Sequence, residues 1–270
     1  MDSQLDFTPP PAPPAPVDAQ QRRQVPRWAH LAAVVLGVGP LYGLVFYSGL
    51  NATQESYRIS TAGLLANVAM MLSFGVFLIV LLRLLGEHVS ALQLQRGTLV
   101  SDIAQGVGLF FIVLGSLFAL RIAMVALETA GLLPKESGIP DSNLELVGSV
   151  ARNPWLLALF LGPVIWLQAA VVEELTRAFV LTRLWKVWPE RSARLASVFV
   201  WSLFFGLAHI YQGAVGVVGT ALIGLVLGLF YFHRGRLLPL MVAHGLYDTL
   251  ATAVLLYALH HPELMPPALL

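Results

Sequence analysis

Six polar residues lie inside three very apolar stretches of this chain, in sets with helical spacing. An ionisable group at membrane depth costs about 2.5–3.5 kcal/mol even on lenient insertion scales, so such a residue marks a functional site by default. Three helices that each carry one set would form a single buried polar site, and the mixture of acidic, imidazole and guanidinium groups indicates chemistry. The sets are Glu173, Glu174 and Arg177 in VVEELTRAFV, His209 in LFFGLAHIYQ, and His244 with Asp248 in MVAHGLYDTL.

The first set combines two carboxylates and one guanidinium on a single predicted helix. Glu173 and Glu174 precede Arg177 by four and three residues, so either carboxylate could pair with the guanidinium on one helix face. Consecutive helical residues point about 100° apart, so the two glutamates cannot play identical roles. We expect one to pair with Arg177 and the other to act as a general base, and we assign the base to Glu173. The segment alone is also compatible with a helix leaving the membrane through interfacial charges.

The second and third sets place histidines on two further predicted helices. His209 follows Phe205 by one turn near the end of an apolar stretch, where a lone histidine is commonly an interfacial residue. His244 lies inside an apolar stretch with Asp248 one turn later. The carboxylate could accept a hydrogen bond from the imidazole and fix its tautomer. Because an aspartate without a role is rare on a membrane helix, this pair indicates function more strongly.

Two chemistries are open to these side chains, and both hydrolyse peptide bonds. Glu173, His209 and His244 could hold a zinc ion with an open position that activates water. Alternatively, a buried glutamate activates water directly, while the histidines donate hydrogen bonds to the oxyanion that forms. The potential metal ligands lack the H-E-x-x-H spacing on one helix, so a zinc site would depend entirely on tertiary packing. The sequence therefore leaves the cofactor open between zinc and none.

The elements that must position these residues are membrane helices. Of the 270 residues, 57% are hydrophobic and 11% are charged, whereas a soluble domain has about 25% charged residues. Since about 20 apolar residues cross a bilayer as a helix, the sequence predicts an all-α, polytopic bundle of seven to eight transmembrane helices. We expect the fourth to continue as a helix past Arg177 toward Trp185, and the fifth and sixth to form an antiparallel hairpin. Seven spans can be placed, at about residues 28–50, 61–85, 104–127, 155–175, 195–213, 214–232 and 237–259.

The basic residues predict the orientation of the bundle. With a cytoplasmic N-terminus, eleven of the 16 Lys and Arg residues lie in cytoplasmic segments and three on the opposite side, as the positive-inside rule favours. We therefore expect an integral protein of an inner or plasma membrane. Residues 1–27 are predicted to be a disordered Pro-rich cytosolic tail, residues 28–260 the membrane domain, and residues 261–270 a short tail. The absence of cysteine excludes disulfides, and nothing beyond the arginines that topology explains supports nucleic-acid binding.

The three motifs resemble those of the CPBP family of intramembrane proteases, which includes CAAX prenyl proteases and bacteriocin-processing enzymes and is also called the Abi family. EELTR, FGLAH and HGLYD follow the order of the family's Glu-Glu…Arg, Phe-x-x-x-His and His-x-x-x-Asn/Asp motifs, over about residues 150–255. One departure puts the role of Arg177 in doubt, because two residues separate it from Glu174 where the family has three. The resemblance implies that the catalytic residues are Glu173, Glu174, His209, His244 and Asp248, with Arg177 and Phe205 in support.

The resemblance also implies a helical bundle around a polar, water-accessible cavity, usually with eight spans, and endoproteolysis within or near the membrane. A glutamate would activate water and histidines would stabilise the transition state, although the family is often labelled a metalloprotease. The expected partners are a membrane-anchored peptide or protein substrate and the lipid bilayer. Two other classes fit the residues: a non-catalytic scaffold or immunity protein of the same fold, and a proton-coupled transporter with a Glu and His relay. A transporter would be expected to have repeated halves or broken helices, and neither is clear in the sequence.

Overall fold

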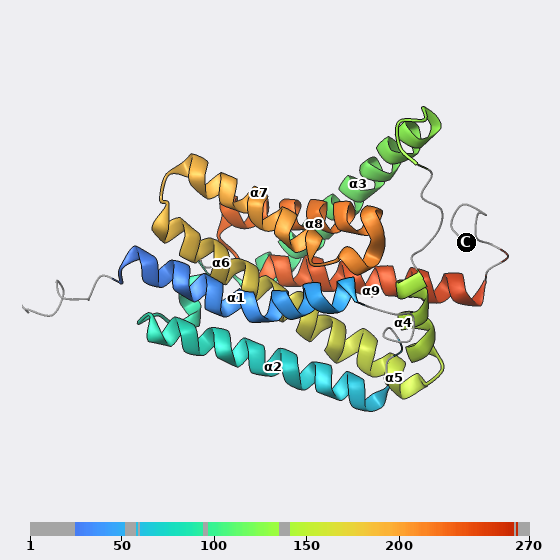
Figure 1. The fold of residues 1–270 in the computed structure, drawn as a ribbon, viewed down its shortest axis with the longest axis horizontal. Helices are drawn as coiled ribbons and strands as arrows, with labels where there is room; N and C mark the ends of the chain where they lie inside the picture. The colour runs from blue at the N-terminus through green and yellow to red at the C-terminus, as the bar shows by residue number, and fades with distance from the viewer. Residues whose placement is uncertain are drawn as a thin grey trace, which may run out of the picture.

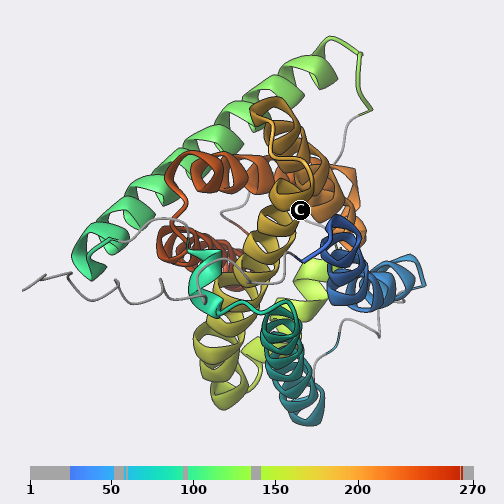
Figure 2. The same cartoon turned by 90° about the vertical axis from the view of Figure 1, so that its left-hand side faces the viewer.

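The computed structural model describes residues 25–51, 58, 60–93, 97–134, 141–261 and 263, so most of the two predicted tails lies outside the described residues. Throughout these ranges the chain is a helical bundle without a strand (Figures 1 and 2), as predicted. Its α-helices are α1 (Arg27–Leu50), α2 (Thr61–Leu84), α3 (Leu99–Thr129), α4 (Asp141–Ala151), α5 (Pro154–Leu159), α6 (Glu174–Val187), α7 (Arg191–Leu207), α8 (Gly213–Arg234) and α9 (Leu238–His260).

Six of the described helices are long and apolar enough to cross a membrane, which indicates an integral membrane protein. They correspond to the predicted spans except the fifth. That span is helical as α7, but α7 has 17 residues and ends at Leu207 rather than at residue 213. The difference arises because the chain turns through His209 and the short 3₁₀-helix η6 (Ile210–Gln212) before α8 begins.

The helix that carries the double glutamate runs from Pro154 to Val187, as the predicted extension of the fourth span requires. Its first half contains two π-helical segments, η4 (Phe160–Val164) and η5 (Trp166–Glu173). Pro163 lies inside the first segment and has no backbone N–H to donate, so regular α-helical bonding is interrupted there. The second segment ends at Glu173, and Glu174 opens the regular helix α6. The two glutamates therefore lie at a change of helix type.

α7 and α8 form the predicted antiparallel hairpin, and small residues let them approach closely. A Cβ atom on Gly206 would lie 2.6 Å from both the Val217 carbonyl oxygen and the Ala221 Cβ atom. A Cβ atom on Gly228 would lie 2.7 Å from Val198 Cγ1. This tight packing fixes the end of α7, and hence His209, relative to α8.

α9, which carries His244 and Asp248, is held between α3 and the π-helical segment η5. A Cβ atom on Gly106 of α3 would lie 2.9 Å from the backbone oxygen of Pro239 in α9. On the other side, a Cβ atom on Gly245 would lie 2.8 Å from the Trp166 ring. The first contact brings the backbones of α3 and α9 close together, and the second places α9 against the helix that carries the glutamates. In Figure 1 α9 crosses the bundle beneath α8.

Candidate active site

Glu174 and Arg177 form a fully buried ion pair within the first turns of α6. Arg177 Nε donates to Glu174 Oε2 at 2.8 Å and Arg177 Nη2 donates to Glu174 Oε1 at 3.1 Å, a bidentate arrangement. A third bond runs from Arg177 Nη1 to the carbonyl oxygen of Gly224 in α8, at 2.8 Å. Both side chains have 0% exposure. The shortened spacing still lets Arg177 pair with Glu174, because residues three apart share a helix face.

The same carboxylate holds His244. The imidazole Nδ1 lies 2.7 Å from Glu174 Oε1, and because an ionised carboxylate only accepts, Nδ1 is the donor. The opposite nitrogen, Nε2, lies 3.8 Å from Glu173 Oε2 and 3.9 Å from Asp248 Oδ2. Both distances exceed hydrogen-bond length. We expected Asp248 to accept the hydrogen bond that orients the His244 ring. In the structure Glu174 accepts that hydrogen bond instead.

His209 is oriented by the backbone of its own helix end. Its Nδ1 lies 2.9 Å from the Phe205 carbonyl oxygen, so Nδ1 is the donor and Nε2 is left for other partners. The Phe205 ring packs against both histidines, with ring centroids 5.0 Å from His209 and 6.1 Å from His244. The Arg177 guanidinium lies 4.8 Å from the centre of the same ring. Phe205 thus packs against residues from all three motifs.

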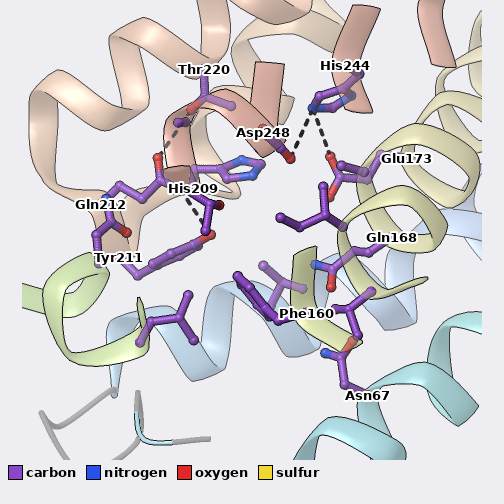
Figure 3. Close-up of a pocket in the computed structure, with 18 of the residues that line it drawn as sticks. Asn67, Phe160, Gln168, Glu173, His209, Tyr211, Gln212, Thr220, His244 and Asp248 are labelled. Carbon is purple, nitrogen blue, oxygen red and sulfur yellow. Dashed lines mark hydrogen bonds and ion pairs between the residues drawn. The ribbon is translucent and has the colours of Figure 1, made fainter. Parts of the chain in front are cut away.

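The motif residues divide between a cavity and the packed interior behind it. A cavity of about 540 Å³ is lined by Glu173, His209, His244 and Asp248, which Figure 3 shows around its upper part. Glu174 and Arg177 are absent from its lining. The exposed fraction of the Glu173 side chain is 19%, against 0% for Glu174. The three sets do meet at one polar site, and the two neighbouring glutamates occupy different environments within it.

Polar residues that the sequence analysis did not select also line this cavity. Gln212 Nε2 donates to Tyr211 Oη at 3.1 Å, and Thr220 Oγ1 donates to Gln212 Oε1 at 3.4 Å, beside His209. Asn67 of α2 and Gln168 of η5 lie on the opposite wall (Figure 3). The sequence does contain a signal for Asn67 and Gln168, because each places an amide side chain inside an apolar span. Nothing in the sequence distinguishes Tyr211 and Gln212 from ordinary loop residues.

The described side chains do not fit a metal ion. Among the described residues no group of three or more His, Cys, Asp or Glu side chains is placed to hold one, so the possible zinc set Glu173, His209 and His244 does not converge.

Comparison with known proteins agrees with the motifs. A family model described as type II CAAX prenyl endopeptidase Rce1-like matches residues 154–250, a segment that contains every candidate catalytic residue. No curated protein and no solved structure matches the chain. The match confirms the resemblance to the CAAX protease, or CPBP, family that the three motifs indicate. It supports a CAAX-type intramembrane endopeptidase in general.

Proposed function

We propose that this protein is an intramembrane endopeptidase that hydrolyses a peptide bond of a membrane-associated substrate with water activated by Glu173. The observation that carries the proposal is the division between the two glutamates. Glu174 is fully buried and bonded to Arg177 and His244, whereas Glu173 lines the cavity beside His244 Nε2. A carboxylate that is free to exchange a proton with water is what a general base requires.

In the proposed reaction, Glu173 removes a proton from a water molecule in the cavity. The oxygen of that water attacks the carbonyl carbon of the scissile peptide bond, which gives a tetrahedral intermediate with a negatively charged oxygen. The carbon–nitrogen bond then breaks, and the proton held by Glu173 passes to the leaving amine. The products are a carboxylic acid and an amine, and the Glu173 carboxylate is regenerated.

In this proposal one histidine stabilises the tetrahedral intermediate and the other orients the attacking water. A protonated His244 donates from both nitrogens, with Nδ1 held by Glu174 and Nε2 directed to the oxyanion. Asp248, 3.9 Å from Nε2, supports the cationic ring by its charge. His209 donates from Nδ1 to the Phe205 carbonyl, which leaves Nε2 to accept a hydrogen bond from the attacking water. The surrounding apolar walls strengthen these interactions by excluding bulk solvent.

Arg177, Glu174 and Phe205 are positioning residues in this proposal. Arg177 fixes the Glu174 carboxylate through two hydrogen bonds and ties it to α8 through the Gly224 carbonyl. Glu174 in turn fixes the rotation of the His244 ring. Supporting groups of this kind hold a reactive side chain to within a fraction of an ångström of its productive position.

Cleavage of a panel of membrane-anchored peptides, including a prenylated CAAX peptide, by the purified protein in liposomes tests the proposal. The wild type, Glu173→Gln and His244→Ala are compared, each with and without a chelator. Glu128→Gln is the matched control, because Glu128 pairs with Arg121 outside the cavity. Cleavage that is lost in the first two variants, kept in the control and insensitive to chelator supports glutamate chemistry. Full activity in Glu173→Gln would overturn the assignment, and loss with chelator would point to a metal.

A further inference from the structure

The cavity lies toward one end of the helical bundle. In α1 it is lined by residues 41–49, in the second half of that helix, and in α2 by residues 64–70, near its start. It also takes in α4 and the connection between α7 and α8, where Tyr211 and Gln212 lie. All these segments belong to the end at which α1 finishes and α2 begins, on the right of Figure 1. The cavity therefore lies toward the end of the bundle opposite to the start of α1.

The opposite end of the bundle is the basic one. Eight of the described Lys and Arg residues lie there, at the start of α1, the end of α2, the end of α6, the start of α7 and the α8–α9 turn. They are Arg27, Arg83, Arg183, Lys186, Arg191, Arg194, Arg234 and Arg236. At the cavity end the described connections carry Arg58 and Arg152. Because connections of this length obey the positive-inside rule, the basic end is the cytoplasmic one.

Exposed tryptophans mark both ends as membrane interfaces. Trp28 and Trp188 are exposed at the basic end, and Trp155 is exposed at the cavity end. Tryptophan is enriched at the level of the lipid headgroups on both sides of a bilayer. The two ends thus face opposite aqueous compartments, and the difference in basic residues between them indicates the orientation of the bundle in the membrane.

We propose that the catalytic cavity opens to the non-cytoplasmic side of the membrane. This inference rests on the proposed function, because the position of the cavity defines a substrate class only if the protein is a protease. The scissile bond lies in a peptide segment on the far side of the membrane, such as the translocated part of a membrane-anchored protein or an exported peptide. A peptide tail held in the cytosol would meet the basic end, away from Glu173.

Cysteine labelling tests the sidedness directly, because the chain has no cysteine of its own. Ser48→Cys places a thiol at the cavity lining, and Ser192→Cys places one on the exposed start of α7 at the basic end. A membrane-impermeant maleimide is applied to intact cells and, separately, to lysed cells. We expect Ser48→Cys to react in intact cells and Ser192→Cys to react only after lysis. The reverse pattern, or equal labelling of both in intact cells, would overturn the proposal.

A second arm links sidedness to cleavage. Two single-span reporters carry the same scissile segment, one on the cytoplasmic side and one on the far side, and each is expressed with wild type and with Glu173→Gln. We expect cleavage of the far-side reporter alone, and only with wild type. Cleavage of the cytoplasmic reporter alone would overturn the proposal. Labelling does not depend on catalysis. If Ser48→Cys is labelled from outside but neither reporter is cleaved, the result would count against the protease function and would still support the non-cytoplasmic position of the cavity.

Two amide side chains, those of Gln168 and Asn67, line the cavity on the side of Glu173. Gln168 and Glu173 lie five residues apart in the π-helical segment η5. Since π-helical hydrogen bonds join residues five apart, these side chains lie one above the other on the same face. Figure 3 shows Gln168 pointing into the cavity between Glu173 and Asn67. Asn67 Oδ1 is buried and has no hydrogen-bond partner among the described residues.

We propose that Gln168 and Asn67 bind the main chain of the substrate peptide next to the scissile bond. An amide side chain offers both a donor and an acceptor, which matches the paired N–H and C=O groups of an extended peptide. In an apolar cavity an unpaired amide is costly, so a ligand that satisfies it is favoured. The two residues would set the position of the scissile carbonyl relative to the water on Glu173. This inference also rests on the proposed function.

Binding and kinetics of Gln168→Met and Asn67→Leu test this subsite, with Gln105→Met of α3, outside the cavity, as the control. The probe is the best-cleaved peptide of the panel and its analogue with an ester in place of the amide next to the scissile bond. We expect KM to rise roughly tenfold in each variant, the equivalent of about 1.4 kcal/mol, with little change in kcat. The ester should weaken binding to wild type more than to Gln168→Met. Unchanged KM, or equal ester effects in both proteins, would overturn the proposal. Measuring peptide affinity in the Glu173→Gln background separates this outcome from a failure of the catalytic assignment.

Discussion

Glu173 and Glu174 are neighbours with the same side chain, and their surroundings give them different tasks. Glu174 accepts hydrogen bonds from Arg177 and His244 and has no contact with the cavity. Glu173 lines the cavity, and its carboxylate lies 3.8 Å from the free nitrogen of His244. A single amide substitution at each position should therefore have a different consequence, which makes the pair a sensitive test of the site.

At Glu173, replacement by glutamine removes the proposed base without leaving a buried charge unpaired. We expect kcat to fall by about 10²–10⁴-fold, the usual contribution of a positioned general base, while the unfolding temperature in detergent stays near that of wild type. Peptide cleavage and thermal unfolding measured on the same preparation check this. A large fall in unfolding temperature would instead assign Glu173 a structural role.

At Arg177, replacement by methionine leaves the Glu174 carboxylate buried with one partner fewer. Removing one member of a buried ion pair typically costs about 3–5 kcal/mol, so we expect a marked loss of folded protein in detergent. Arg177→Lys should rescue little, because a single ammonium nitrogen cannot reproduce the planar guanidinium fork that reaches both Glu174 oxygens and the Gly224 carbonyl. Fluorescence-detected size exclusion and thermal unfolding measure both variants. Wild-type stability in Arg177→Met would show that the pair is dispensable.

Sequence alone could identify these residues but could not assign their partners. Ionisable groups in apolar stretches single out all six positions, because the bilayer penalises them. The choice between Glu173 and Glu174 as the partner of Arg177 depends on helix rotation, since both spacings allow contact. The partner of His244 lies 70 residues away in the chain, so the neighbouring Asp248 was the natural but incorrect choice for the orienting hydrogen bond.

At the scale of elements, apolar length predicted the helices well and their internal geometry poorly. The continuation of the fourth span to Val187 and the α7–α8 hairpin follow from hydropathy and a very short connection. The π-helical segments before Glu173 were not predicted, although they decide which side chains share a face with that residue. Pro163 was the visible sign of irregular bonding, but a proline does not specify the type of distortion.

The α7–α8 hairpin gives a prediction about packing. Gly206→Ala puts a methyl group 2.6 Å from the Val217 carbonyl oxygen, which is backbone and cannot rotate away. Overpacking of this kind costs about 1–3 kcal/mol, and the shift it forces should also displace His209, three residues later. We expect a lower unfolding temperature and reduced cleavage. Gly115→Ala in α3, where nothing lies within 4 Å, is the control and should leave both quantities unchanged or slightly raise stability.

At the scale of the whole molecule, the end opposite the cavity is closed by an ionic contact between helices distant in sequence. Glu87, after α2, accepts a hydrogen bond from Arg183 Nη2 of α6 at 2.6 Å and forms a second ion pair with Lys186. Burial alone would raise the pKa of Glu87, but the hydrogen bonds and charges of Arg183 and Lys186 outweigh it and lower the pKa. The contact thus holds α2 against α6 while the carboxyl group is ionised.

This contact predicts a dependence of stability on pH. Because the folded-state pKa of Glu87 lies below its unfolded value, the stabilisation is present above the unfolded pKa, near 4.5. It is lost as the pH falls through the lower folded-state value. We expect Glu87→Gln to lower the unfolding temperature at neutral pH and the difference from wild type to shrink as the medium is acidified. Thermal unfolding across acidic to neutral pH measures this, and a difference that grows on acidification would contradict it.

The short spacing between Glu174 and Arg177 has a consequence for how the protein is made. The two charges lie within one turn of the same helix, so they can neutralise each other before any later helix has been synthesised. The segment 154–187 can therefore enter the bilayer as an apolar helix with an internal ion pair. His244 comes on the last described long helix, α9. A nascent chain that has inserted as far as α8 holds its glutamates but lacks the imidazole that completes the site. Proteolytic activity would thus begin when the last of these helices docks, after the rest of the bundle is in the membrane.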